Sequence, residues 1–169
     1  NMPLLDIVGV APTNASFIVA SAFLAGETAE HYTWALESLF MLTEEKRPRF
    51  VITDCDEGLM NAIDATRTGQ TMRHTLCRWH IERNVVKNCK SLFPVAEQFE
   101  TLQRQVAQLM RASTEANFDN VWAEIVATCP SAAAVDYFER VWMRYKQRWA
   151  SPWTDTGVPL WLHDDLSRR

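Results

Sequence analysis

The stretch RFVITDCDEGLMNAI, residues 49–63, decides the predicted fold of this chain. The apolar run at 50–53 predicts a short buried strand, and the helical spacing of the apolar residues that follow predicts a helix at 57–65. Two carboxylates, Asp54 and Asp56, lie between these elements. The stretch therefore predicts a strand that passes into a helix through an acidic junction.

The two carboxylates have two candidate roles. In an open sheet, ligands bind beyond the carboxyl ends of the strands, where Asp54 is expected. A carboxylate there is a ligand for Mg²⁺, although metal-assisted phosphoryl transfer needs several of them jointly. The alternative is an N-cap that accepts from the free N–H groups of the helix. Asp56, directly before Glu57, is the better placed cap, which leaves Asp54 without an evident structural role.

Patterning predicts an α/β first half and a helical second half. The first half is predicted as β-β-α-β-α-β, with strands at 4–10, 16–24, 50–53 and 72–76 and helices at 27–45 and 57–65. The second half is predicted as helices at 78–91, 94–112, 114–128 and 131–150. The tail 151–169 carries two prolines and no periodicity, which predicts irregular structure.

Composition favours an ordinary globular chain. The 169 residues are 47% hydrophobic and 22% charged, and no apolar run reaches the roughly 18 residues of a membrane span. A net charge of −4 does not indicate a general nucleic-acid binder, so any such contact depends on a local patch. No glycine-rich phosphate loop, GxSxG or HExxH is present, which argues against triphosphatase, esterase and zincin chemistry.

A second constellation lies in HTLCRWHIERNVVKNCK, residues 74–90. Cys77 and His80 have a C-x2-H spacing that supplies two zinc ligands, but a zinc site normally has four. A buried thiol and a hydrogen-bonded histidine are the alternative.

The same stretch carries a basic strip. Arg83, Lys87 and Lys90 share a face of the predicted helix, with Arg73 and Arg78 before it and Trp79 beside it. Such a strip suits a phosphate backbone, and a solvated helix face is the alternative.

The order of these motifs resembles the transposase domain of Mutator-like elements (MULE), which is also found in FAR-RED IMPAIRED RESPONSE-like proteins. The resemblance runs over residues 1 to about 93 and rests on Pro3-Leu4-Leu5, Gly26-Glu27, Trp34-Ala35-Leu36, Thr53-Asp54 and Cys77-Arg78-Trp79-His80. It implies a partial RNase H-like core at 1–93, a helical insertion at 94–150 and a truncated tail at 151–169. Glu27, Cys77 and His80 occupy motif positions without an assigned role.

The resemblance also implies a DDE-type site, in which three acidic residues bind Mg²⁺ or Mn²⁺ for DNA cleavage and strand transfer. Asp54 corresponds to the middle acid. The first acid and its strand are expected before Asn1, and the last acid is expected beyond Arg169. Asp6 does not occupy the position of the first acid. The sheet is therefore expected to be incomplete, and the chain is expected to be a fragment that is inactive alone.

Function follows from these expectations in two forms. The first is a fragment of a transposase domain whose full-length relative is expected to act on transposon ends in the nucleus, as a homo-oligomer. The second is a domesticated derivative that regulates transcription and contacts DNA without cutting it, in which Arg78, Arg83 and Lys87 matter.

Overall fold

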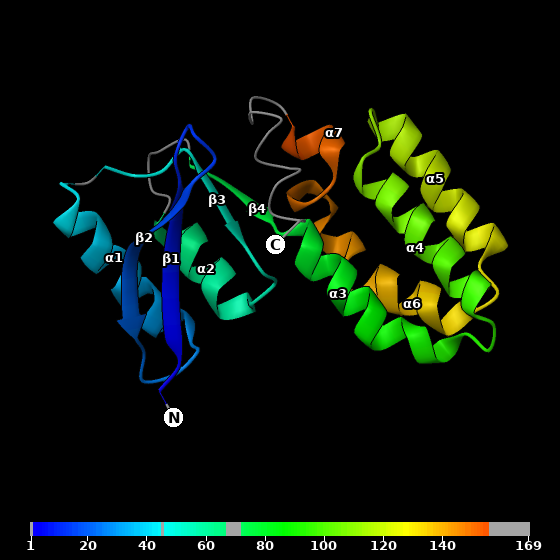
Figure 1. Cartoon of the computed structure of the whole chain (residues 1–169), viewed down its shortest axis with the longest axis horizontal. Coiled ribbons are helices and arrows are strands. Elements are labelled where there is room, and N and C mark those ends of the chain that lie inside the picture. Colours follow the sequence, from blue (N-terminus) through cyan, green and yellow to red (C-terminus); the bar gives the residue numbers. More distant parts are fainter. Residues whose placement is uncertain (1, 45, 67–71, 156–169) are drawn as a thin grey trace. The chain divides into compact units, whose positions relative to one another are not determined.

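The computed structural model describes residues 2–44, 46–66 and 72–155 (Figure 1). The chain divides into two compact units. The first contains Asn1–Val51 and Asp56–His74, and the second contains Ile52–Cys55 and Thr75–Arg169. No helix in the described ranges is both long and apolar enough to cross a bilayer.

An antiparallel hairpin opens the first unit. Strand β1 (Leu4–Val10) pairs with β2 (Ser16–Phe23), with one irregularity in register after Ile7. In the connecting turn, Asn14 adopts a φ of 61°, a conformation that asparagine tolerates better than most side chains. The predicted hairpin is confirmed.

Two helices pack beside this hairpin. Helix α1 (Ala29–Leu42) begins after Thr28, whose hydroxyl accepts from the backbone N–H of His31 at 3.4 Å. Helix α2 (Glu57–Thr66) is the helix predicted from the opening stretch. Contacts among the hairpin, both helices and β3 form one apolar core, which contains Leu24, Tyr32, Ala35, Leu36, Phe40, Ala62, Ile63 and Met72, with Leu5, Ile7, Ala22, Val51 and Leu59 at its margin.

The predicted start of the first helix was two residues early. Glu27 precedes the N-cap Thr28 and lies outside α1, because the threonine hydroxyl supplies the cap. Only Glu30 occupies the first turn, where a carboxylate interacts favourably with the helix dipole.

Strands β3 (Phe50–Thr53) and β4 (Arg73–Leu76) form a second two-stranded sheet. The N–H of Arg73 donates to the carbonyl of Arg49 at 2.8 Å, and the N–H of Cys77 donates to that of Thr53 at 2.7 Å. Both bonds have the same sequence offset, which shows that the strands are parallel. Among the described residues, the strands form two separate two-stranded sheets, one antiparallel and one parallel, and the predicted incomplete RNase H-like mixed sheet stays a prediction. The prediction that a strand is missing stays a prediction.

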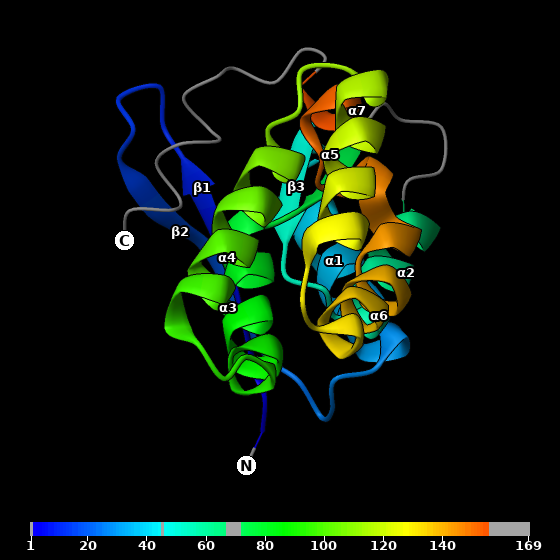
Figure 2. The same cartoon turned by 90° about the vertical axis from the view of Figure 1, so that its right-hand side faces the viewer.

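The second unit is mainly helical. Its elements are α3 (Arg78–Cys89), a 3-10 turn η1 (Lys90–Leu92), α4 (Ala96–Met110), α5 (Glu115–Thr128), α6 (Ala132–Val141), a 3-10 segment η2 (Met143–Arg148) and α7 (Ser151–Thr154). Figure 2 shows α3 to α6 side by side, and α3 and α5 each contact both α4 and α6. The helices bury Ile81, Val85, Leu102, Val106, Leu109, Phe118, Val121, Ile125, Phe138, Trp142 and Trp149.

The predicted continuous helix at 131–150 is wrong. Helix α6 ends at Val141, and the chain turns through η2, where Tyr145 has non-helical dihedral angles. The indole N–H of Trp149 donates to the carbonyl of Trp142 at 2.9 Å, which satisfies a carbonyl at the end of the helix. Burying two tryptophans on one core therefore takes precedence over helical periodicity. Likewise, the tail predicted as irregular contains α7, while 156–169 lie outside the described residues.

Candidate functional site

The candidate site lies at the carboxyl edge of the parallel pair β3–β4. The hydrogen bond from the N–H of Cys77 to the carbonyl of Thr53 joins the residue after β4 to the last residue of β3. Asp54 follows β3 and Cys77 follows β4, so the two predicted motifs are brought together at one edge. Parallel pairing places both strand ends on the same side, and Asp54 lies at a strand end, as predicted.

Asp54 and Asp56 have different roles. The Asp56 carboxylate accepts from the N–H of Leu59 at 2.7 Å, and its carbonyl accepts from the N–H of Met60 at 2.9 Å. Asp56 is therefore the cap of α2, as predicted. Asp54 is exposed, and within the described ranges its carboxylate makes neither a hydrogen bond nor an ion pair. Asp54 therefore does not cap α2.

Close packing supports the first turn of α2. A Cβ added to Gly58 would lie 3.2 Å from the backbone nitrogen of Ala29 and 3.3 Å from the carbonyl oxygen of Glu27. Only glycine allows this approach of the two chain segments without a shift. The motif residue Glu27 thus contributes its backbone here, while its side chain is exposed.

For the metal expected from the resemblance, the described part of the chain supplies Asp54 but not a complete set of ligands. No group of three His, Cys, Asp or Glu side chains is placed to hold an ion there. A single exposed carboxylate lacks the joint charge that metal-assisted cleavage needs. The described residues therefore do not by themselves form a complete metal site.

Cys77 and His80 lie at the start of α3. The Cys77 carbonyl accepts from the N–H of Ile81 at 3.1 Å, and its side chain makes no capping bond and is half-buried. The His80 ring packs edge-on against Trp79, with centroids 4.8 Å apart, and its Nδ1 atom is buried without a partner among the described residues. Cys77 is not the buried thiol that was predicted, and the His80 ring forms no hydrogen bond with another described residue.

Arg78 has an internal role. Its Nε donates to the carbonyl of Trp149 at 3.0 Å, and its Nη2 donates to Ser151 Oγ at 2.9 Å and Thr154 Oγ1 at 3.3 Å. The same nitrogen pairs with Asp155 at 3.3 Å, and 16% of the arginine side chain is exposed. Arg78 was predicted to contact nucleic acid, but these bonds turn its guanidinium toward η2 and α7, which removes it from the accessible cations.

The remaining cations form a narrower basic strip, which we define as Arg83, Lys87 and Lys90. All three are exposed, and none forms an ion pair with a described residue. The guanidinium of Arg83 lies over the Trp79 ring, 5.4 Å from its centroid. Patterning predicted this strip, whereas the bonds of Arg78 join residues more than 70 positions apart and have no local signal.

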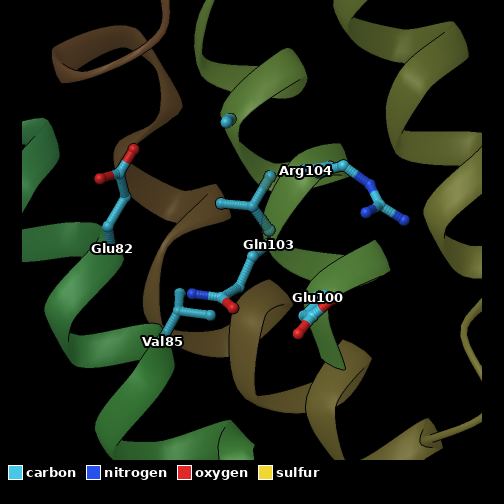
Figure 3. Close-up of a pocket in the computed structure, with 7 residues that line it drawn as sticks. Glu82, Val85, Glu100, Gln103 and Arg104 are labelled. Carbon is cyan, nitrogen blue, oxygen red and sulfur yellow. The ribbon is translucent and has the colours of Figure 1, made fainter. Parts of the chain in front are cut away.

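A shallow pocket of about 440 Å³ lies between α3 and α4 (Figure 3). Glu82 and Val85 line it from α3, while Glu100, Gln103 and Arg104 line it from α4. Sequence reasoning missed this pocket, because it depends on how two helices meet. It contains none of the predicted site residues.

The comparisons with known proteins confirm the family resemblance. Residues 1–84 match the family described as the MULE transposase domain. This chain is therefore related to MULE transposase domains over its first half. No solved structure matches it.

Several curated proteins of Arabidopsis thaliana are similar to the chain. Protein FAR1-RELATED SEQUENCE 4 is 23% identical over 125 residues, which is 74% of this chain and 16% of that protein. Protein FAR-RED IMPAIRED RESPONSE 1 is 23% identical over 126 residues, covering 75% of the chain and 15% of the relative. Protein FAR1-RELATED SEQUENCE 12 is 22% identical over 164 residues, 96% of the chain and 18% of the relative. The chain spans less than a fifth of the length of these relatives.

Proposed function

We propose that this chain is part of a MULE-type transposase domain, with Asp54 as one of three metal-binding acids, and that it does not cleave DNA by itself. The observation that carries the proposal is the free carboxylate of Asp54 at the end of a parallel strand, beside a second aspartate that serves as the helix cap. The match of residues 1–84 to the family supports it.

The arrangement of the strands supports an incomplete RNase H-like sheet. Leu5 and Ile7 of β1 pack on the same core as Val51 of β3, yet the two strands belong to separate pairs. A further strand between β1 and β3 would join the pairs into one mixed sheet. We assign this position to the segment that carries the first acid in the complete domain.

The outer face of the hairpin also fits an incomplete domain. Large apolar side chains are exposed there, with 51% of Leu4, 56% of Val8, 72% of Ile18 and 67% of Phe23 accessible. The polar pair Asp6 and Ser21 separates the Leu4–Phe23 pair from the Val8–Ile18 pair. Large apolar side chains exposed in this way are typical of surfaces that contact further protein. In the complete protein, further chain would cover it.

The cleavage proposal is tested with two lengths of protein. The 169-residue chain and a version extended through both flanking segments are incubated with labelled duplex DNA and Mn²⁺. We expect nicks or joined strands only with the extended protein, and Asp54→Asn should abolish them. Asp56→Asn is the matched control and should retain activity after correction for stability. Cleavage by the short chain that depends on Asp54 would contradict the proposal.

A second function, in which the chain is a non-cleaving derivative that contacts DNA and regulates transcription in the nucleus, is favoured by the basic strip. Arg83 and Lys87 of α3 and Lys90 of η1 offer three charges that form no ion pair with a described residue, and Arg83 lies over the Trp79 ring. Such cations bind phosphate without reading sequence, and their affinity falls steeply with salt.

Filter binding to random duplex tests this function. We expect retention at low salt, and a double variant Arg83→Ala/Lys87→Ala should bind more weakly and lower the salt slope by about 1 per lost phosphate contact. Arg111→Ala, which removes an exposed cation outside the strip, is the control. Equal binding by both variants would argue against the strip.

A further inference from the structure

A second surface on α1 has no role in the proposed function. Glu30, Trp34, Glu37 and Met41 follow one another at helical spacing on the side of α1 opposite the core, and we call them the acidic stripe. Trp34 is 59% exposed and Met41 is 74% exposed. Neither glutamate has an ion pair among the described residues. The stripe therefore combines free negative charge with exposed apolar side chains.

The basic strip is opposite to the acidic stripe in charge and equal to it in spacing. Glu30 and Glu37 are seven residues apart on a helix, which corresponds to about 10.5 Å along the axis. Arg83 and Lys90 are also seven residues apart, and Lys90 keeps helical dihedral angles. Between the charges lies Trp34 on one surface and Lys87 on the other.

We propose that the acidic stripe of one copy of this chain packs against the basic strip of a second copy. Glu30 and Glu37 pair with the two outer cations, and the Lys87 ammonium lies over the Trp34 ring in a cation–π contact. Met41 adds apolar area that is otherwise exposed to water. Charge complementarity identifies the occupant, because DNA and anionic membranes carry the same sign of charge as the stripe and would be repelled.

Each copy carries one acidic stripe and one basic strip. Two copies can therefore pair reciprocally in a closed dimer, or successive copies can associate head-to-tail in rings or open chains. Pairs of exposed ions contribute little individually, so the association is expected to be weak and salt-sensitive.

Two charge-reversal variants test the proposal by sedimentation velocity at about 0.05 M salt. Glu30→Lys/Glu37→Lys removes the acidic stripe, and Lys87→Glu/Lys90→Glu removes the basic strip. We expect the wild-type protein to form larger species as concentration rises, and each variant alone to remain monomeric. An equimolar mixture of the two should associate again, because both charged surfaces of one variant then meet surfaces of opposite charge on the other. Circular dichroism melting of each variant checks that it is folded.

Three outcomes would overturn the proposal. The wild-type protein could remain monomeric at every concentration, each variant could associate as the wild type does, or the mixture could stay monomeric. Association of each variant alone would place the contact on another surface, such as the apolar face of the hairpin.

The DNA proposal uses the same strip but fails separately. Glu30→Lys/Glu37→Lys leaves the strip intact, so it should still bind duplex while it no longer self-associates. If the wild-type protein does not bind DNA, the association expected in the sedimentation experiment is unaffected. The two proposals are therefore distinguishable on the same set of proteins.

Discussion

The guanidinium of Arg78, the first residue of α3, donates a hydrogen bond to the backbone carbonyl of Trp149 at 3.0 Å. The same side chain reaches Ser151, Thr154 and Asp155. One arginine thus joins the start of the helical unit to the last elements that the structure describes.

Replacing Arg78 should destabilise the protein. Arg78→Ala removes several charge-assisted bonds from a mostly buried side chain, so the free energy of unfolding should fall by about 2–3 kcal/mol. Arg78→Lys should recover little, because an ammonium cannot reproduce the planar fork of donors. Urea unfolding measures both, and Arg83→Ala, on an exposed face of the same helix, should change stability by less than about 0.5 kcal/mol. Similar losses for Arg78→Ala and Arg83→Ala would be inconsistent with this role.

Replacing Asp54 and replacing Asp56 should have different effects on the free energy of unfolding. Asp56→Ala removes the N-cap of α2 and should cost about 1 kcal/mol. Asp54→Ala removes no hydrogen bond from the described structure and should be nearly neutral. The measurement is the urea midpoint of each variant, and a larger loss for Asp54 than for Asp56 would reverse the assignment.

Gly58→Ala should destabilise the protein although alanine is the better helix former. The intrinsic gain of up to about 1 kcal/mol is opposed by a Cβ only 3.2–3.3 Å from two backbone atoms. We expect a net loss of about 1–2 kcal/mol from overpacking. Asn61→Ala, at an exposed position of the same helix, is the control and should be neutral or slightly stabilising. A more stable Gly58→Ala variant would show that the α1 and α2 segments can separate without cost.

Cys89 should make stability fall at alkaline pH. Burial raises the pKa of the Cys89 thiol from its ordinary value of 9.0 to about 11, and the negative charge of an ionised Cys129 raises it further in the same direction. Below pH 9 the thiol is protonated in both states and contributes no pH dependence. Between pH 9 and pH 11 the unfolded chain loses the proton first, so stability falls by up to about 1.4 kcal/mol per pH unit. Chemical unfolding across this range should give a flatter profile for Cys89→Ala, and parallel profiles would contradict the assignment.

Local patterning predicted most elements of the first half. The hairpin needed only two β-rich runs around Pro12 and Asn14, and α2 needed only its apolar spacing and a capping aspartate. These features depend on residues that are close in the chain, so the sequence alone predicts them. The end of α6 at Val141 could not be predicted in this way, because the helical periodicity of the sequence continues past it. The helix ends there because Trp142 and Trp149 are both buried in the same core.

The candidate site also has features that the sequence predicted and features that it did not. Asp54 and its neighbour Asp56 were assigned different roles from their positions alone, and the structure confirms the cap. The internal role of Arg78 was missed, since its partners follow it by more than 70 residues. The pocket between α3 and α4 was missed because it depends on how the two helices pack against each other, which local patterning does not show.

By itself, the sequence determined the succession of strands and helices, the helix cap at Asp56 and the charges of α3, because each depends on groups a few positions apart. Only the tertiary structure decided which of these groups are accessible. It turned Arg78 inward and left Arg83, Lys87 and Lys90 in solvent, and it left Asp54 free at the strand end. The physical reason is that accessibility and hydrogen-bond partners are set by segments that are distant in the chain and adjacent in space.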